Sequence, residues 1–314
     1  MISRAKIATV ALACGLAACG GSAPDAEVES TAEAQVAEAV GVLVVYTTNY
    51  PLAYFAERIA GDRVQVEFPA PPGIDPAYWT PAPEQIADYQ GADVIFLNGA
   101  GYEGWVAKAS LPESRLVNTS AGFEDLYVVA EEAVLHTHGP EGEHEHENVA
   151  FTTWLDPQLA IEHARAIRDA LTDLMPAAEA DLQAGFEALE ADLTEIDARL
   201  EAWATARAGQ ALLASQPVYQ YLTRRFELNL RSVHFEPDEM PDRAGWAELR
   251  SILDEHPAEW MLWEAEPILE MADALRELGI ESVVFSPAAN RPSQGDYLAV
   301  MRRNVESLRR VFAP

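Results

Sequence analysis

The longest regular alternation of apolar and polar residues in the chain lies between Pro176 and Ala208. Seven apolar side chains recur there at alternating steps of four and three, a spacing that places all of them on one stripe of an α-helix. They are Leu182, Phe186, Leu189, Leu193, Ile196, Leu200 and Trp203. Glu, Asp and Ala fill most other positions, so the remaining faces can meet water. Such a helix is roughly 50 Å long, and we expect it to join two bodies rather than to form a coiled-coil arm.

Short runs rich in β-forming residues alternate with helical stretches on both sides of this segment. The expected strands are Val42–Thr47, Val64–Phe68, Asp93–Asn98 and Arg115–Asn118 before it, and Ala211–Ser215, Arg231–Phe235, Trp260–Glu264 and Ser282–Phe285 after it. The expected helices are Pro51–Ala60, Pro83–Gln90, Leu159–Leu174, Val218–Phe226, Trp246–Glu255 and Pro267–Leu278. This alternation predicts an α/β fold with parallel sheets, arranged as two similar lobes joined by one long rigid helix. Ligands bind beyond the carboxyl ends of parallel strands, which predicts a site in a cleft between the lobes.

The first 41 residues are interpreted as export and tethering segments. Arg4 and Lys6 precede an apolar run at 7–18 that is too short to span a bilayer. The run ends in Leu-Ala-Ala-Cys-Gly, which is similar to a bacterial lipobox. We therefore predict a lipoprotein signal peptide at 1–19 with Cys19 lipidated; an ordinary secretory peptide is the alternative. The remaining predicted segments are a flexible tether at 20–41, an N-terminal lobe at 42–175, the connecting helix at 176–208 and a C-terminal lobe at 209–314.

Composition argues against several classes of function. The formal net charge of −30 disfavours binding to nucleic acids or to anionic membranes through charge. Of the two cysteines, Cys14 and Cys19, only Cys19 remains in the mature chain, so no intramolecular disulfide is expected. Residues 99–104 match the dinucleotide fingerprint G-x-G-x-x-G, but they follow a later strand and no ribose-binding unit comes after them. We interpret them as a tight turn, and we predict that the protein is not an enzyme.

A histidine-rich tract is the clearest signal for metal chemistry. Four of the seven histidines, His136, His138, His144 and His146, fall within eleven residues and alternate with glutamates. Neutral imidazole is the commonest metal ligand in proteins, and short histidine-rich tracts are typical of metal capture. We predict that these four side chains bind a metal, with a solvated polar loop as the alternative.

Other candidate ligands stand at the ends of expected strands or in a turn. Glu264 ends a strongly apolar strand and can face the cleft, whereas Glu266 is placed to cap the following helix. His234 and Glu236 flank the end of another strand. Asp75 either forms a turn or supplies a ligand. We include Glu264, His234, Glu236 and Asp75 in the predicted metal site.

Residues 42–312 resemble the zinc/manganese solute-binding proteins of bacterial ABC importers. The motifs that carry this resemblance are Tyr50-Pro51-Leu52, Arg58-Ile59-Ala60-Gly61-Asp62, Pro71-Pro72-Gly73-Ile74-Asp75-Pro76, Ala92-Asp93-Val94, Asn98-Gly99, Trp154-Leu155-Asp156-Pro157, Tyr219-Gln220-Tyr221-Leu222, Glu236-Pro237-Asp238 and Tyr297-Leu298. The resemblance implies two α/β lobes joined by one long helix, in agreement with the periodicity.

The positions that hold metal ligands in that family differ here. The family's two histidines of the first lobe align with Ala77 and Thr152, its His or Glu after the first strand of the second lobe with Gln216, and its last acidic residue with Ser286. Thr, Gln and Ser are poor ligands for zinc or manganese compared with imidazole and carboxylate. Either this branch builds its site from other residues, or its cleft binds something else.

The resemblance and the residues together imply an extracytoplasmic solute-binding lipoprotein of the cell envelope. We expect it to capture a divalent metal, zinc first, and to deliver it to an ABC permease in the inner membrane. We expect a monomer that touches the membrane only through its lipid. One alternative is a non-metal solute or a metal chelate, held by Trp79, Trp154, Trp263, Thr152 and Gln216; another is a surface adhesion or assembly protein.

Overall fold

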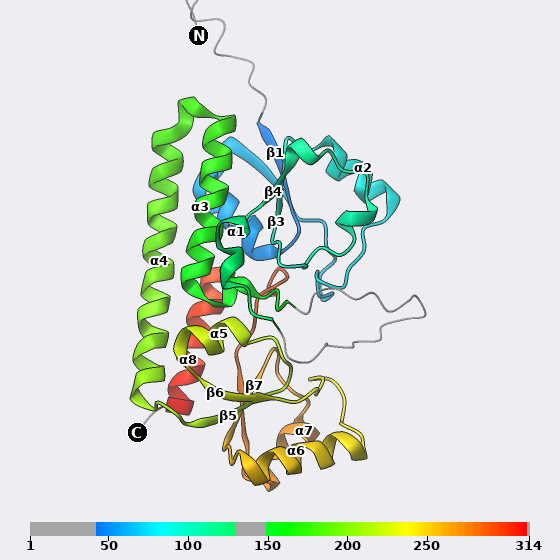
Figure 1. Ribbon diagram of the computed structural model, residues 1–314, viewed down its shortest axis with the longest axis vertical. Helices are drawn as coiled ribbons and strands as arrows, with labels where there is room; N and C mark the ends of the chain where they lie inside the picture. Colours follow the sequence, from blue (N-terminus) through cyan, green and yellow to red (C-terminus); the bar gives the residue numbers. More distant parts are fainter. Residues whose placement is uncertain (1–41, 130–148, 313–314) are drawn as a thin grey trace, which may run out of the picture. The chain divides into compact units, whose positions relative to one another are not determined.

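The computed structural model describes residues 42–129 and 149–312, and these contain two four-stranded parallel sheets (Figure 1). The first sheet has the order β2-β1-β3-β4 and the second the order β6-β5-β7-β8, so the two sheets repeat one topology. Their strands are β1 (Leu43–Thr47), β2 (Val64–Glu67), β3 (Val94–Leu97), β4 (Leu116–Asn118), β5 (Ala211–Ala214), β6 (Asn229–Ser232), β7 (Trp260–Trp263) and β8 (Glu281–Val284). The predicted fold of two similar α/β lobes is confirmed.

Helices cover both sheets. The α-helices are α1 (Tyr50–Ala60), α2 (Pro83–Gly91), α3 (Pro157–Leu174), α4 (Glu179–Ala206), α5 (Gln220–Phe226), α6 (Arg243–Glu255), α7 (Leu269–Glu277) and α8 (Tyr297–Phe312). Short 3₁₀ turns occur at Gly61–Arg63, Val106–Lys108, Glu113–Arg115, Ala121–Leu126, Thr153–Leu155 and Pro176–Ala178. Among the described residues, no helix has both the length and the apolar character that crossing a membrane requires.

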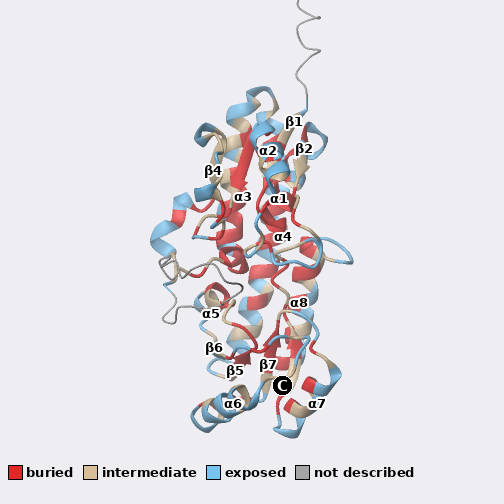
Figure 2. Cartoon of the chain, turned by 90° about the vertical axis from the view of Figure 1, so that its right-hand side faces the viewer, coloured by how far each residue is buried: buried red, intermediate tan, exposed pale blue. Residues whose placement is uncertain are grey.

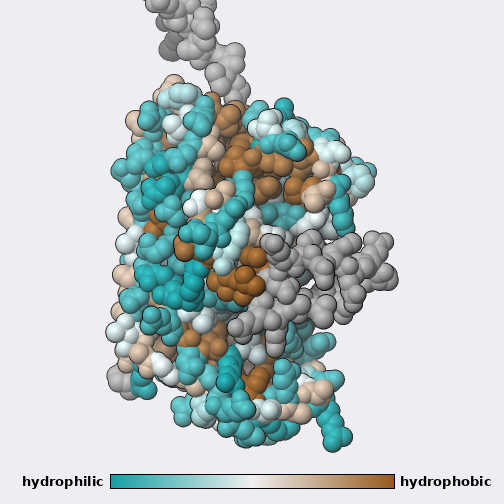
Figure 3. Space-filling view, viewed as in Figure 1, coloured by the Kyte–Doolittle hydropathy of each residue, from teal (hydrophilic) through white to brown (hydrophobic). Residues whose placement is uncertain are grey.

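Helix α4 links the lobes, as its apolar stripe predicts. It packs against α1 and α3 of the first lobe and against α5 and α8 of the second. Six of the seven stripe residues are buried and Trp203 is partly buried. Figure 2 shows buried residues on α4 and α8 between the two sheets, and Figure 3 shows mostly hydrophilic residues on the side of the molecule where α4 lies. The helix therefore buries one face along both lobes and exposes the other.

Two local expectations need correction. Strand β6 pairs with β5 from Asn229 to Ser232, two residues earlier than expected, and the apolar Val233 and Phe235 follow the strand instead of forming it. Both are buried, so their apolar character reflects packing rather than pairing. Helix α7 begins at Leu269 with Ile268 as its N-cap, which leaves Glu266 outside the helix and without the expected capping role.

The loop after β8 extends to the first lobe and lies between the two lobes. The backbone N–H of Tyr50 donates to the carbonyl of Ala289 at 2.9 Å, and the indole N–H of Trp154 donates to the carbonyl of Pro287 at 2.8 Å. The side-chain amide of Asn290 donates to the carbonyls of Pro71 and Ile74, both at 2.7 Å. These bonds attach the loop of the second lobe to the first lobe.

Changing Gly185 to alanine is expected to lower the free energy of unfolding by about 1–3 kcal/mol, because the core there has no room for an added methyl group. Gly185 lies on α4, and a Cβ at this position would come within 2.3 Å of the carbonyl oxygen of Ile59 on α1. Gly91→Ala is the control, since a Cβ there meets nothing within 4 Å. Urea unfolding measures both variants; equal stability of the two would contradict the close approach of α4 to α1.

Candidate functional site

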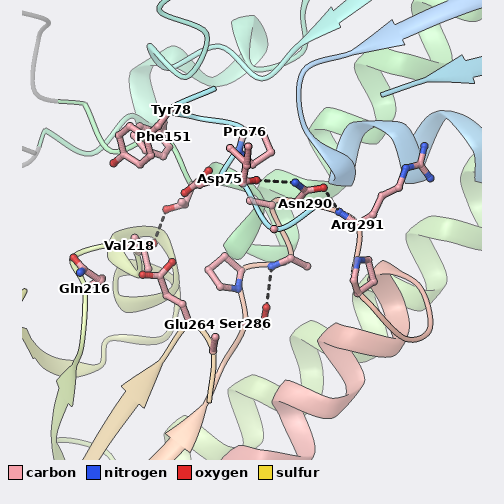
Figure 4. A pocket seen from close by; sticks show the side chains of 18 of the residues that line it. Asp75, Pro76, Tyr78, Phe151, Gln216, Val218, Glu264, Ser286, Asn290 and Arg291 are labelled. Atoms are coloured by element: carbon pink, nitrogen blue, oxygen red, sulfur yellow. Dashed lines mark hydrogen bonds between the residues drawn. The ribbon is translucent and has the colours of Figure 1, made fainter. Parts of the chain in front are cut away.

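A pocket of about 640 Å³ lies between the lobes, where the predicted cleft was expected (Figure 4). The first lobe contributes the turn after β2 and the segment before α3. The second lobe contributes the chain that follows the carboxyl ends of β5, β6, β7 and β8. Residues on the walls include Asp75, Tyr78, Tyr102, Phe151, Thr152, Trp154, Gln216, Glu236, Glu264, Ser286 and Arg291. Both lobes must therefore keep their arrangement for the pocket to exist.

Three predicted ligand residues, Asp75, Glu236 and Glu264, line this pocket. Figure 4 shows Asp75 on the first-lobe side and Glu264, at the end of β7, on the second-lobe side. Burial raises the pKa of Glu264 to about 7, and the negative charges of Asp75 and Glu236 add to this effect. Burial and the charges of all three carboxylates raise the pKa of Tyr78 to about 12. The pocket is thus an electronegative space that opposes further negative charge.

Asp75 has two roles. Its carboxylate accepts a hydrogen bond from the backbone N–H of Ala77 at 2.9 Å, which confirms that it forms a turn. The same residue lines the pocket, and burial raises its pKa although the Ala77 bond partly offsets the effect. The turn therefore holds a carboxylate beside Ala77, the position that the resemblance aligns with a family histidine.

His234 is the one remaining predicted ligand within the described part of the chain. Its side chain is exposed and does not line this pocket. The four histidines His136, His138, His144 and His146, like Cys19, lie outside the described residues. Within residues 42–129 and 149–312, no three His, Cys, Asp or Glu side chains converge closely enough to hold a metal ion.

Three polar residues at the positions that the resemblance aligns with metal ligands form hydrogen bonds within the protein. The Thr152 hydroxyl donates to the carbonyl of Val218 at 2.5 Å, and the Gln216 amide donates to the Glu236 carboxylate at 2.9 Å. The Ser286 hydroxyl accepts from the backbone N–H of Ala288 at 3.3 Å. Thr152 and Gln216 thereby shape the walls of the pocket.

Only part of the tryptophan set proposed for an organic solute reaches the pocket. Trp154 lines it, and its ring contacts Tyr102 edge to face at a centroid distance of 5.7 Å. Trp79 packs against the main core and Trp263 is buried in the second lobe, so neither is a wall residue. The sequence pattern did not show which of these three tryptophans would line the pocket.

The pocket's basic residue points away from the carboxylates. Figure 4 shows the Arg291 side chain directed away from Glu264. Its guanidinium lies over the rings of Tyr50 and Phe68, at 5.5 and 5.8 Å, and 3.9 Å from the carboxylate of Glu57. Because Arg291 is held by these partners, it does not neutralise the charge that Asp75, Glu236 and Glu264 create.

A set of hydrogen bonds around Glu103 and Asn98, which reaches wall residue Phe151, was not predicted from the sequence. The Glu103 carboxylate accepts from the Thr48 hydroxyl at 2.5 Å and from the backbone N–H groups of Asn98 and Gly99 at 2.5 and 3.2 Å. Asn98 in turn donates to the carbonyl of Phe151, a wall residue, at 2.9 Å. Glu103 therefore takes up the backbone donors that a nucleotide phosphate would need, in keeping with the interpretation of residues 99–104 as a turn.

Two other polar residues have structural roles. His163 is fully buried between the hydroxyls of Thr119 and Thr153, at 2.6 and 2.8 Å, and burial lowers its pKa to about 3. Asp156 accepts from the backbone N–H of Gln158 at 2.9 Å and is the N-cap of α3. Neither residue lines the pocket.

Comparison with known proteins gives one family. A family model described as ZnuA, zinc-uptake complex component A, periplasmic, matches residues 45–311. The match therefore includes both sheets apart from the first two residues of β1, together with helix α4 and every described carboxylate of the pocket.

Individual relatives agree with this match. The zinc-binding lipoprotein AdcA of Streptococcus pneumoniae strain R6 is 25% identical over an alignment of 283 residues that covers 87% of this chain and 56% of that protein. The chain thus spans about half the length of that relative. The high-affinity zinc uptake system protein ZnuA of Bacillus subtilis strain 168 is 26% identical over 314 residues, with 94% of this chain and 92% of that protein covered. The crystal structure of the metal-dependent lipoprotein YcdH from Bacillus subtilis shares the fold, with a TM-score of 0.73 and 23% identity over 85% of this chain and 98% of that one.

Proposed function

Since the chain belongs to the ZnuA family of periplasmic zinc-uptake components, we propose that it captures a divalent metal ion outside the cytoplasm and delivers it to the permease of an ABC importer. Zinc is the first candidate, because the relatives named above include zinc-binding and zinc-uptake proteins. The observation that carries the proposal is the family match across both lobes, together with a pocket between them that gathers three carboxylates.

The family consists of solute-binding proteins and not of enzymes, so the expectation that this chain catalyses no reaction is confirmed. Function then depends on binding and release. Asp75 belongs to the first lobe, whereas Glu236 and Glu264 belong to the second. A cation between them attracts carboxylates from both lobes and stabilises one arrangement of the two. A permease that recognises this arrangement would distinguish loaded from empty protein.

The anchor and the partner are parts of the same proposal. Cys19 would carry the lipid and residues 20–41 would tether the lobes to the membrane of the cell envelope, with the protein acting as a monomer beside an inner-membrane permease. The sequence similarity of residues 16–20 to a lipobox supports this. Mass spectrometry of the mature N-terminus tests it, since a chain that begins at an unmodified residue other than Cys19 would exclude the anchor.

The four histidines of the tract are proposed as an auxiliary capture site. Changing His136, His138, His144 and His146 to alanine is expected to lower the number of zinc ions bound per chain, because imidazole is a strong zinc ligand. The wild-type protein should bind zinc with a Kd below about 1 µM. Isothermal titration calorimetry of the full chain measures both quantities, and metal analysis of protein purified without chelators supports them.

His234→Ala is the matched control, because His234 lies outside the pocket and outside the tract. It should bind as many zinc ions as the wild type. An absence of heat with zinc, manganese, copper, nickel and iron would exclude capture of the free ions. A wild-type stoichiometry in the fourfold variant would exclude the tract while leaving the pocket as the site.

A further inference from the structure

The pocket is larger than a bare metal ion requires. Zinc–ligand bonds are about 2 Å long, so a dedicated ion site brings its donors within a sphere about 4 Å across. Here the pocket has a volume of about 640 Å³, and no three His, Cys, Asp or Glu residues of the described chain converge in it. This volume lies in the range of pockets that hold small organic ligands.

The walls on the first-lobe side are aromatic. The ring of Tyr78 contacts that of Phe151 at a centroid distance of 6.3 Å, Phe151 contacts Tyr102 at 5.3 Å, and Tyr102 contacts Trp154 at 5.7 Å, all edge to face. Figure 4 shows Tyr78 and Phe151 side by side at one end of the pocket. A bare ion with its hydration shell gains little from such a wall, whereas an organic surface packs well against it.

One wall residue carries an unsatisfied polar atom. The Tyr102 side chain is 2% exposed, and its hydroxyl has no hydrogen-bond partner among the described residues. A buried hydroxyl without a partner costs about 1–3 kcal/mol. An acceptor or donor atom on a bound ligand would remove this cost, so the Tyr102 hydroxyl points to a ligand with polar atoms of its own.

We propose that the pocket binds its divalent metal as a preformed cationic complex with a small nitrogen-donor molecule. The carboxylates of Asp75, Glu236 and Glu264 attract the positive charge, and the rings from Tyr78 to Trp154 contact the organic part. Zinc prefers nitrogen and sulfur ligands, and none of the pocket-wall residues within 42–129 and 149–312 is a histidine or cysteine. The small molecule therefore supplies the nitrogen donors that these described walls lack. This inference rests on the proposed function and names the form of its cargo.

Calorimetry on the fourfold tract variant tests the inference. In this variant His136, His138, His144 and His146 are changed to alanine, so that zinc binding by the tract does not contribute to the measured heat. The probes are zinc alone, zinc with one equivalent of 2,2′-bipyridine, zinc with one equivalent of L-histidine, and each organic molecule alone with EDTA. At least one complex should bind about tenfold or more tightly than zinc alone, a difference of about 1.4 kcal/mol. The metal-free molecules should not bind.

Two tyrosine variants in the same background test the aromatic wall. Tyr102→Phe removes only the unpartnered hydroxyl and should weaken binding of the complex at least threefold without lowering stability. Tyr89→Phe is the matched control, since the Tyr89 hydroxyl already donates to the carbonyl of Thr47 at 3.0 Å and does not line the pocket. It should lose stability and keep its affinity.

Each contrary outcome has a separate meaning. Zinc alone binding as tightly as both complexes would overturn the inference and leave the proposed function intact. Binding of a metal-free molecule as tight as that of its complex would overturn the inference in favour of an organic solute. Failure of the wild-type chain to bind zinc in any form would overturn the proposed function as well.

Discussion

Replacing Glu264 by glutamine is expected to stabilise the ligand-free protein at pH 8 and to weaken cation binding at least tenfold. The pKa of Glu264 is raised to about 7 by burial and by Asp75 and Glu236, whereas a carboxyl of this kind in the unfolded chain titrates near 4.3. Between these two pH values the folded state holds a proton that the unfolded state has lost. Stability therefore falls as pH rises through this window, and the whole penalty is present above pH 7.

Glutamine does not ionise, so the variant does not lose stability in this way as the pH rises. Allowing for screening by water in the pocket, Glu264→Gln should raise the free energy of unfolding at pH 8 by about 1–3 kcal/mol, with the difference vanishing toward pH 4. In the wild type, a bound cation offsets the repulsion between the charged carboxylates of Glu264, Asp75 and Glu236. The variant lacks the charge at position 264, so it should bind the cation more weakly. Thermal unfolding at several pH values and calorimetry measure the two effects.

Glu266→Gln is the control for both effects, because Glu266 lies two residues further along, is exposed and does not line the pocket. It should change neither stability nor affinity. A Glu264→Gln variant that unfolds like the wild type at pH 8 and binds cations as tightly would show that Glu264 does not face the cargo.

Replacing Glu103 by alanine is expected to lower the free energy of unfolding by about 2–4 kcal/mol, because three donors lose a charged acceptor. They are the Thr48 hydroxyl and the backbone N–H groups of Asn98 and Gly99. Burial raises the pKa of Glu103 to about 7, so relief of its desolvated charge offsets part of this loss above that pH. Urea unfolding at pH 6 and pH 8 measures the change.

Glu103→Gln separates the hydrogen bonds from the charge. Its side-chain oxygen can still accept from Thr48 and Asn98, which both bond to one oxygen of the carboxylate. This variant should lose less stability than Glu103→Ala, and its stability should depend less on pH between 5 and 8. Equal losses in the two variants would mean that the hydrogen bonds to Glu103 contribute little.

The fold could be predicted from the sequence because its signals are periodic and local. The stripe from Leu182 to Trp203 defines α4, and the expected helix Leu159–Leu174 includes all of α3 except its first two residues. Helix α8 was not among the expected helices, although its buried residues from Tyr297 to Phe312 also follow a helical period. The β6 boundary differed because Val233 and Phe235 are buried without belonging to the strand.

The site could be predicted only in part. Glu264, Glu236 and Asp75 were recognised because they follow strands or a proline-rich turn, and the structure brings all three to one pocket. The roles of Glu103 and Tyr102 could not be derived in this way, since their contacts join residues far apart in the chain. Thr48 is 55 residues from Glu103 in the sequence, and no local pattern encodes that pairing. His234 does not line the pocket, which the sequence could not show, because a strand end alone does not tell which way a side chain points.

Anomalous diffraction at the zinc edge tests the central claim most directly, with crystals of the fourfold tract variant grown with zinc, in the presence and absence of L-histidine. The account predicts an anomalous peak between the lobes, beside the carboxylate of Glu264, in at least one of the two crystals. A peak elsewhere, or no peak between the lobes in either crystal, would contradict it.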